Sequence, residues 1–395
     1  MNICIVNIRE NNPYIGGVER VSYILGHDWQ KRGHHVFFLS QYKSNLLKEY
    51  GSSCPEFFLP DPRDAEAEGN FSFFVELLIA NKIDVVINQG SVFHGLCELC
   101  QKVRHSTGVK LITVIHYAPL YRLAANESGF FIKEKLGKNI LKWLIDIGLY
   151  LNYHLVGKLR IINAIKKELH EFAAYSDAIV CLSESFLPEI RSLSGEGRAK
   201  IVAITNPVNL DGNSVISAKK KQIIYVGRLE LGLKRVDRLV KIWAKTEDLF
   251  PDWSFHIVGD GDMRYLFERM ARDKGLKHIY FDGFQDPDKY YAESSIICLS
   301  SSSEGFGMVL VEALKQQCIP VAYHSFSSLT DIIVNNVNGY CIPPFNEKKY
   351  LEKLHHLMSD EAERMRLAAN HRLTLKRFDL ETVSTQWQSL FKDIV

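Results

Sequence analysis

The sequence lacks any long uncharged hydrophobic run, although 46% of its 395 residues are hydrophobic. No stretch approaches the roughly 18 apolar residues that a membrane-spanning helix requires, so we expect no spanning segment. Residues 1–12 carry neither a basic leader nor a long apolar core, and they are expected to form a first strand rather than a secretion signal. These absences predict a cytoplasmic protein.

A strong excess of one charge is also absent, because the formal net charge is only +2. This balance gives no global case for nucleic acid as a partner. The eight cysteines mostly lie inside apolar segments, which is typical of buried thiols in a reducing compartment. Cys97 and Cys100 form a Cys-x-x-Cys pair, but no second pair follows at the spacing of a zinc site. A structural role is therefore favoured over a redox or metal role.

The length favours two domains, since 395 residues exceed what one hydrophobic core usually supports. An apolar run at residues 3–8, a helical pattern at 18–31 and a second apolar run at 35–39 are typical of the start of a doubly wound sheet. Gly16 and Gly17, at the start of this helix, can expose amides to a phosphate or a sugar. The alternative is a mere tight turn. The third glycine of a dinucleotide fingerprint is missing, which disfavours NAD.

A histidine closes a predicted strand of the first domain. His116 is the last residue of the apolar run 111–116, and Pro119 breaks the pattern that follows. Ligands of such sheets lie beyond the carboxyl ends of the strands, so His116 is expected to face a cleft. Taken alone, a histidine at the end of a strand is more often structural.

Residues 121–175 depart from the alternation of strands and helices. Apolar residues recur there at three- and four-residue steps, as in a helix, and lysine and arginine outnumber the acids. Apolar stripes with basic flanks can lie on an anionic membrane surface. The alternative is a helical insertion that packs on the sheet and keeps a solvated basic face. The stripe consists of Trp143, Leu144, Ile147, Leu151 and Leu155.

A second domain follows the predicted hinge at residues 206–218. Its first strand, 222–226, leads into the turn that holds Arg228 and then Lys234 before a helix. Both cations are expected to point into the cleft, where they would neutralise a diphosphate. The alternative is ordinary surface charge near a turn.

Two later strand ends carry Gly259 and Gly283. Asp260 and Asp262 superficially match an Asp-x-Asp metal motif, but they stand at a turn and a helix start, where capping is the usual role. No metal site is therefore expected.

The most informative segment is 304–314, which reads EGFGMVLVEAL. It follows an apolar run and four serines, so it predicts a buried strand, a tight turn and a helix. Gly305 and Gly307 allow close approach of a ligand, and amides at the helix start can hold an anion. Glu304 would lie in the turn and Glu312 about one turn inside the helix. The alternative is an acidic helix start that the helix dipole favours.

Two glutamates with seven residues between them, in EGFGMVLVE, resemble the signature of retaining glycosyltransferases of family 4, and GRLELGLKR resembles their diphosphate-binding segment. The resemblance implies an α/β fold of GT-B type, with two Rossmann-like doubly wound domains facing a central cleft. Residues 1–210 would form the acceptor-side domain, with the insertion 121–175, and 219–375 the nucleotide-sugar domain. Residues 376–395 would form a helix that returns to the first domain.

The resemblance also implies roles for the candidate residues. Arg228, Lys234 and the backbone of Gly305, Phe306 and Gly307 would hold the diphosphate, Glu312 the ribose, and Glu304 the sugar hydroxyls. The nucleotide would pack near Gly259 and Gly283, with Gly16 and Gly17 as a further phosphate or sugar contact. His116 would orient the transferred sugar.

The implied reaction transfers a hexose or N-acetylhexosamine from a nucleotide-diphosphate sugar to a hydroxyl of a saccharide or lipid-linked saccharide, with retention and without a metal. A UDP-sugar is the preferred donor and GDP-mannose the second. Peripheral contact with the inner face of an anionic membrane is compatible with the basic segment 121–175. The rival interpretations are an epimerase or phosphorylase on the same fold, a catalytically silent binding subunit, and a nicotinamide oxidoreductase.

Overall fold

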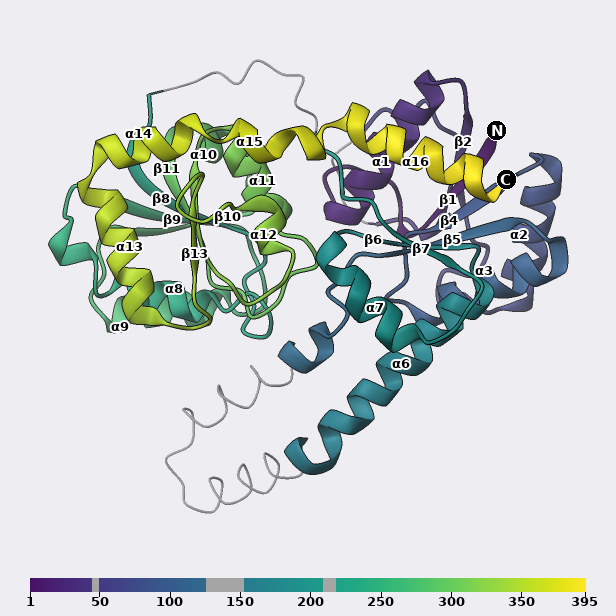
Figure 1. The fold of residues 1–395 in the computed structure, drawn as a ribbon, viewed down its shortest axis with the longest axis horizontal. Helices are drawn as coiled ribbons and strands as arrows, with labels where there is room; N and C mark the ends of the chain where they lie inside the picture. The colour runs from purple at the N-terminus through teal and green to yellow at the C-terminus, as the bar shows by residue number, and fades with distance from the viewer. Residues whose placement is uncertain (45–49, 126–152, 209–217) are drawn as a thin grey trace. The chain divides into compact units, whose positions relative to one another are not determined.

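The computed structural model describes residues 1–44, 50–125, 153–208 and 218–395. The chain divides into two compact units (Figure 1). Unit 1 consists of Met1–Pro119, Ala164–Pro207 and Phe378–Val395, and unit 2 of Leu120–Asn163 and Val208–Arg377. Each unit contains its own sheet, in keeping with the prediction of two doubly wound domains.

The sheet of unit 1 is parallel in every described pair, in the order β3-β2-β1-β4-β5-β6-β7. Its centre is fully buried, since Ile3 to Val6 of β1 have no exposed surface. Parallel strands covered on both faces are near-continuous hydrophobic runs for this reason. The strands are β1 (Asn2–Arg9), β2 (His35–Tyr42), β3 (Glu56–Phe58), β4 (Val85–Asn88), β5 (Lys110–Ile115), β6 (Ala178–Cys181) and β7 (Lys200–Ala203).

Helices cover both faces of this sheet. Phe74 of α2 and Leu99 of α3 join one core with Cys4 and Val6 of β1. Gly26 of α1 lies against Phe38 of β2, whose side chain points to the opposite face from Leu39 in that core, because successive residues of a strand alternate. The helices of this unit are α1 (Gly17–Lys31), α2 (Glu68–Ala80), α3 (His94–Thr107), α7 (Leu187–Ser194) and α16 (Leu380–Ile394), with the 3-10 turn η2 (Glu184–Phe186).

The last helix, α16, packs on α1 at the beginning of the chain (Figure 1). The Trp29 ring lies edge-on to Trp387 and to Phe391, with centroids 5.3 and 5.2 Å apart. Arg32 Nη2 lies 2.6 Å from a carboxylate oxygen of Glu381. Both ends of the chain therefore contribute to unit 1.

Unit 2 contains a second parallel sheet, in the order β10-β9-β8-β11-β12-β13. Its strands are β8 (Lys220–Val226), β9 (Ser254–Val258), β10 (Ile279–Gly283), β11 (Ser294–Leu299), β12 (Ile319–Tyr323) and β13 (Tyr340–Ile342). The helices are α8 (Val236–Trp243), α9 (Arg264–Asp273), α10 (Asp288–Glu293), α11 (Met308–Lys315), α12 (Leu329–Ile332), α13 (Glu347–Ser359), α14 (Glu361–Ala369) and α15 (Arg372–Leu375), with short turns η3 (Glu247–Leu249) and η4 (Lys376–Phe378).

The predicted helical insertion 121–175 is only partly described. Residues 126–152, with Trp143, Leu144, Ile147 and Leu151, lie outside the described residues. The described part contains the π-helical turn η1 (Tyr153–Gly157) and α6 (Lys158–Tyr175). The division between the two units falls within α6. Most of the predicted hinge, residues 209–217, also lies outside the described residues.

One strand end differs from the prediction. The last pair between β5 and β6 joins Ile115 to Cys181, so His116 is the first residue after the strand rather than its last. It still follows the carboxyl end of β5, where a residue of a parallel sheet can meet a ligand.

Candidate functional site

The polar residues of unit 2 gather where its sheet changes winding direction. The chain runs from β8 to β9 and β10 on one side, and then from β11 to β12 and β13 on the other. The switch point therefore lies between β8 and β11, and ligands of open parallel sheets bind beyond the carboxyl ends at this point. The loops that leave these two strands are residues 227–235 and 300–307.

Hydrogen bonds tie these two loops together. The Ser302 amide donates to the Leu233 carbonyl at 2.6 Å, and the Ser300 hydroxyl donates to the Arg235 carbonyl at 2.8 Å. Arg238 of α8 donates from Nη1 to the Ser300 carbonyl at 2.9 Å. Desolvation lowers the pKa of the Arg238 guanidinium to about 10, so it remains charged at neutral pH. The two loops consequently form one rigid surface.

Lys234 and Glu304 meet on this surface. Lys234 Nζ lies 2.7 and 2.6 Å from the two carboxylate oxygens of Glu304, and the Ser301 hydroxyl donates to Oε1 at 2.6 Å. The Glu304 side chain is only 9% exposed. A carboxylate this buried requires a cation or strong donors. The structure thus joins two residues that the sequence assigned to adjacent parts of one ligand.

Arg228 lies in the same loop but outside this contact. Its side chain is 75% exposed, and its guanidinium approaches the Glu230 carboxylate only to 3.7 Å. Its backbone is held more firmly, because the Tyr225 hydroxyl donates to the Arg228 carbonyl at 2.9 Å. The base of the side chain is therefore fixed while the charged end extends into solvent.

Glycines keep the neighbouring strand ends in close contact. A β-carbon on Gly259 would lie 2.0 Å from the Gly227 carbonyl oxygen, and Gly259 has φ of +138°. The Gly227 amide donates to the Val258 carbonyl at 3.0 Å, and the Gly259 amide donates to the Gly283 carbonyl at 2.8 Å. Gly259 therefore serves the close approach of two backbones, a role that only glycine fills.

The segment after β11 adopts the predicted turn and helix. Gly307 has φ of +93° and precedes α11, while Glu312 lies within the helix, one turn after its first residue. Phe306 is 3% exposed, so its ring belongs to the core and only its backbone remains for a ligand. Gly305 is half-buried beside it. The amides at this helix start can favour an anion.

Glu312 has a partner that the sequence did not indicate. The Tyr291 hydroxyl, from α10, donates to Glu312 Oε2 at 2.9 Å, and the Tyr291 side chain is fully buried. The Lys219 ammonium donates to the carbonyls of Tyr291 and Gln316 at 2.8 and 2.6 Å. Desolvation lowers the Lys219 pKa. Lys219 therefore joins α10 to the end of α11.

Two further residues of unit 2 were missed from the sequence. The run of four serines marked the strand end, but it gave no sign that Ser301 would bind Glu304. Phe284, the residue after Gly283, was also overlooked, and it is 68% exposed. The strand end at Gly283 was predicted, but nothing in the sequence indicated that the aromatic side chain after it would be exposed.

Unit 1 has its own switch point, between β1 and β4. Gln89 follows β4, and its Oε1 lies 2.5 Å from His116 Nε2 beyond the neighbouring strand β5. Desolvation lowers the pKa of His116 to about 4, so the imidazole is neutral at pH 7. Gln89 is 3% exposed, and its Nε2 has no hydrogen-bond partner among the described residues.

The glycine pair of unit 1 stands at the start of α1. Gly16 precedes the helix, and a β-carbon there would lie 2.6 Å from Glu19 Oε2. Glu19 in turn pairs with Arg9 at 2.7 Å. A β-carbon on Gly17 would meet nothing within 4 Å. Gly16 therefore makes room for this ion pair, whereas Gly17 has no steric requirement.

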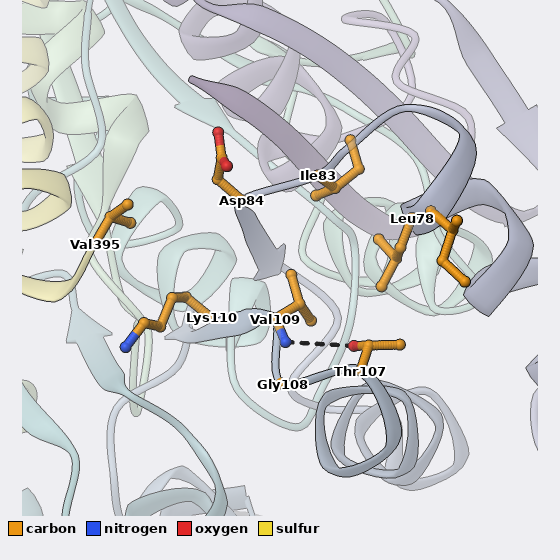
Figure 2. A pocket seen from close by; sticks show the side chains of 9 residues that line it. Leu78, Ile83, Asp84, Thr107, Gly108, Val109, Lys110 and Val395 are labelled. Atoms are coloured by element: carbon orange, nitrogen blue, oxygen red, sulfur yellow. Dashed lines mark hydrogen bonds between the residues drawn. The ribbon is translucent and has the colours of Figure 1, made fainter.

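A pocket of about 360 Å³ in unit 1 lies away from both switch points. Figure 2 shows that Asp84 and Lys110 line it together with Val395. Asp84 directly precedes β4 and Lys110 begins β5, so the pocket lies at the amino ends of the strands. Ligands of such sheets bind at the carboxyl ends, and this pocket is therefore not the candidate site.

The Cys-x-x-Cys pair is buried in α3. Desolvation raises the pKa of the Cys97 thiol to about 12 and that of Cys100 well above its usual value. A reactive cysteine requires the opposite shift. The burial supports the structural role expected for these thiols.

Among the residues that the structure describes, no helix is both long and apolar enough to cross a membrane.

Comparisons with known proteins bear on both halves of the chain. Residues 15–211 match the family described as "Glycosyltransferase Family 4", and residues 209–374 match "Glycosyl transferases group 1". A glycosyltransferase of Haemophilus influenzae named as uncharacterized is 25% identical over 193 residues, which are 48% of this chain and 54% of that protein.

A second relative comes from Campylobacter jejuni. It is named as an α-1,4-N-acetyl-D-galactosaminyltransferase that acts on an undecaprenol-linked saccharide, and it is 24% identical over 176 residues, 45% of this chain and 49% of that protein. These alignments span about half the length of the two relatives.

The crystal structure of Anabaena HepE with UDP-glucose shares the fold, with a TM-score of 0.74, 15% identity and full coverage of both chains. The two family models together extend over residues 15–374, and each unit contains a doubly wound parallel sheet. The chain belongs to the family 4 glycosyltransferases of GT-B fold.

Proposed function

We propose that this protein transfers a hexose or N-acetylhexosamine from a nucleotide-diphosphate sugar to a hydroxyl of a saccharide or lipid-linked saccharide, with retention of the anomeric configuration. The observation that carries the proposal is the contact between Lys234 and Glu304 at the switch point of unit 2, where Nζ lies 2.6 Å from the carboxylate. A cation and a carboxylate at one strand edge match the two parts of such a donor, its diphosphate and its sugar hydroxyls.

The leaving diphosphate would be stabilised by charge and by backbone amides. Lys234 would exchange part of its contact with Glu304 for a phosphate oxygen, and Arg228 would swing its exposed guanidinium onto the same group. The amides of Gly305, Phe306 and Gly307 precede α11 and would add fixed donors. Donors aimed at developing charge are usually the largest contribution to catalysis.

The carboxylates would bind hydroxyl groups. Glu304 is released from Lys234 as the phosphate arrives and would accept hydrogen bonds from the donor sugar. Glu312 would accept hydrogen bonds from the ribose hydroxyls. Gly259 and Gly283 have no side chain and would leave room for the nucleotide at the ends of their strands. Phe284 offers an exposed ring at the same edge for the base.

In unit 1, His116 would orient the transferred sugar as a neutral imidazole, because its pKa is lowered to about 4. The amides at Gly16 and Gly17 would contact a phosphate or a sugar. No carboxylate is assigned as a nucleophile. We therefore propose attack on the same face of the sugar, with the leaving phosphate taking the acceptor proton, instead of double displacement.

We rank UDP-sugars first and GDP-mannose second, and we propose that no metal is needed because Lys234 and Arg228 supply the positive charge. The name of the Campylobacter relative supports a lipid-linked acceptor. The exposed Leu159 and Arg160 of α6 support peripheral contact with an anionic membrane. Co-sedimentation with vesicles with and without anionic lipid tests that contact, and equal recovery from both contradicts it.

The central experiment measures transfer and donor hydrolysis with a panel of UDP- and GDP-sugars, before and after chelation of metals. One donor should be turned over without added metal, and NMR of the product should show the donor's anomeric configuration. Lys234→Ala should abolish most turnover. Lys221→Ala is the matched control, because Lys221 lies at the opposite end of β8 and pairs with Asp252 on the surface. Equal loss in both variants, or activity restored only by a divalent metal, would contradict the proposal.

A further inference from the structure

We infer that Tyr291 is a positioning residue for the nucleoside, which fixes the carboxylate of Glu312 for contact with the ribose hydroxyls. This inference rests on the proposed function and names a residue that the family signature in this sequence does not include. It follows from one hydrogen bond, the burial of one ring and the way two helices are tied together.

A glutamate on a helix has three rotatable side-chain bonds, so an unrestrained carboxylate samples many orientations. Glu312 is half-buried, with the buried residues Val311 and Ala313 on either side in the sequence. The Tyr291 hydroxyl donates to Glu312 Oε2 at 2.9 Å. A hydrogen bond to an ionised group is stronger than one between neutral groups, and a carboxylate can accept several bonds at once. Tyr291 therefore restricts the orientation of the Glu312 carboxylate.

The donor of this bond is itself rigid. Tyr291 has no exposed surface, and its amide donates to the Pro287 carbonyl at 2.9 Å. Its carbonyl accepts a hydrogen bond from Lys219, which also binds the Gln316 carbonyl at the end of α11. The helices that supply Tyr291 and Glu312 are thus held at a constant separation.

The location of the pair fits a nucleoside. Tyr291 lies in α10, which follows the loop that begins with the exposed Phe284, and Glu312 lies in α11, which follows Gly307. A carboxylate repels a phosphate but accepts bonds from vicinal hydroxyls. A carboxylate that is already oriented loses less conformational entropy when it binds them. The affinity gained should therefore depend on the ribose hydroxyls of the ligand.

The test measures dissociation constants by titration calorimetry for UDP and 2′,3′-dideoxy-UDP, with GDP and its dideoxy form in parallel. Wild type should prefer the ribonucleotide by about tenfold, the value expected for hydrogen bonds to a charged group. Glu312→Gln should remove most of this preference. Tyr291→Phe should reduce it to about threefold by weakening ribonucleotide binding alone.

Tyr350→Phe is the matched control. Tyr350 is another fully buried tyrosine of unit 2, and its hydroxyl donates to the Val321 carbonyl at 2.8 Å, away from Glu312. It should keep the tenfold preference. If Tyr291→Phe keeps it too, or weakens both nucleotides equally, the positioning role is wrong while the proposed function stands. If wild type binds no nucleotide, the proposed function fails, and the inference fails with it.

Discussion

The two switch points share one sheet plan but differ in chemistry. In unit 2 the strand ends carry charge, with Lys234 and Glu304 in direct contact. In unit 1 the strand β1 ends in Arg9, which pairs with Glu19, but the ends of β4 and β5 carry neutral groups, with the Gln89 amide against His116, an imidazole of lowered pKa. The strands bring residues together in both units, whereas the loops decide which ligand they suit. Charge suits a diphosphate, and neutral donors and acceptors suit sugar hydroxyls.

Gly259 of unit 2 and Gly17 of unit 1 differ in the space around them, and this difference predicts the largest effect. Gly259→Ala would place a β-carbon 2.0 Å from the Gly227 carbonyl oxygen at a φ of +138°. We expect a loss of more than about 4 kcal/mol in the free energy of unfolding, from backbone strain and steric overlap together.

Gly17→Ala provides the contrast, because a β-carbon there meets nothing within 4 Å. This variant should change the unfolding free energy by no more than about 1 kcal/mol. Urea denaturation of both variants checks the pair. Similar stabilities would show that the close approach of β8 and β9 relaxes at little cost.

Removal of charge from unit 2 should have the next largest effect. Lys234→Ala is expected to lower kcat/KM for the donor by about 100- to 1000-fold, the range seen when one donor to developing charge is removed. Steady-state kinetics with the preferred donor provides the measurement. A loss below tenfold would mean that the Lys234 contact with Glu304 is structural.

Arg228 should matter less than Lys234, although both are cations of one loop. Its guanidinium is 75% exposed and lies 3.7 Å from its nearest acid, so it is not held in place before the donor binds. Arg228→Ala should raise KM for the donor by about tenfold, as expected for one charged hydrogen bond. Arg269→Ala, a change at an arginine of α9 outside the switch-point loops, serves as the control.

The last effect concerns His116 of unit 1 and is confined to acid pH. The folded-state pKa of His116, about 4, lies below the usual value of 6.5, so the unfolded chain takes up a proton first as the pH falls. Wild type should therefore lose stability between pH 6.5 and 4, by about 1–3 kcal/mol since the ring is half-buried. His116→Gln should lose less over the same interval. Parallel denaturation series at several pH values test this, and identical slopes would refute it.

The sequence predicted the strands near the switch points well, for a physical reason. Strands buried on both faces are continuous apolar runs, so β1, β8 and β11 stand out from their surroundings. Two short strands at the edges of the unit 1 sheet were missed: β3 has only three residues, all half-buried, and the apolar run of β7 is short.

The candidate site was only partly predictable. Arg228, Lys234, Glu304 and Glu312 could be selected because a family signature marks them and strand ends flank them. Their hydrogen-bond partners could not be predicted. Tyr291 is 21 residues from Glu312 in the sequence, and Ser301, the partner of Glu304, is one of four consecutive serines. The contact of Tyr291 depends on how α10 and α11 pack, and that of Ser301 on how the loop after β11 folds. The periodicity of residues along the chain predicts neither.

The packing of α16 on α1 has a consequence for folding during synthesis. Trp29 is synthesised before unit 2, and Trp387 and Phe391, which contact its ring, are synthesised after unit 2. All of unit 2 is translated in between. The Trp29 indole therefore lacks these two aromatic partners while unit 2 is translated, and unit 1 can be completed only after unit 2 has been synthesised.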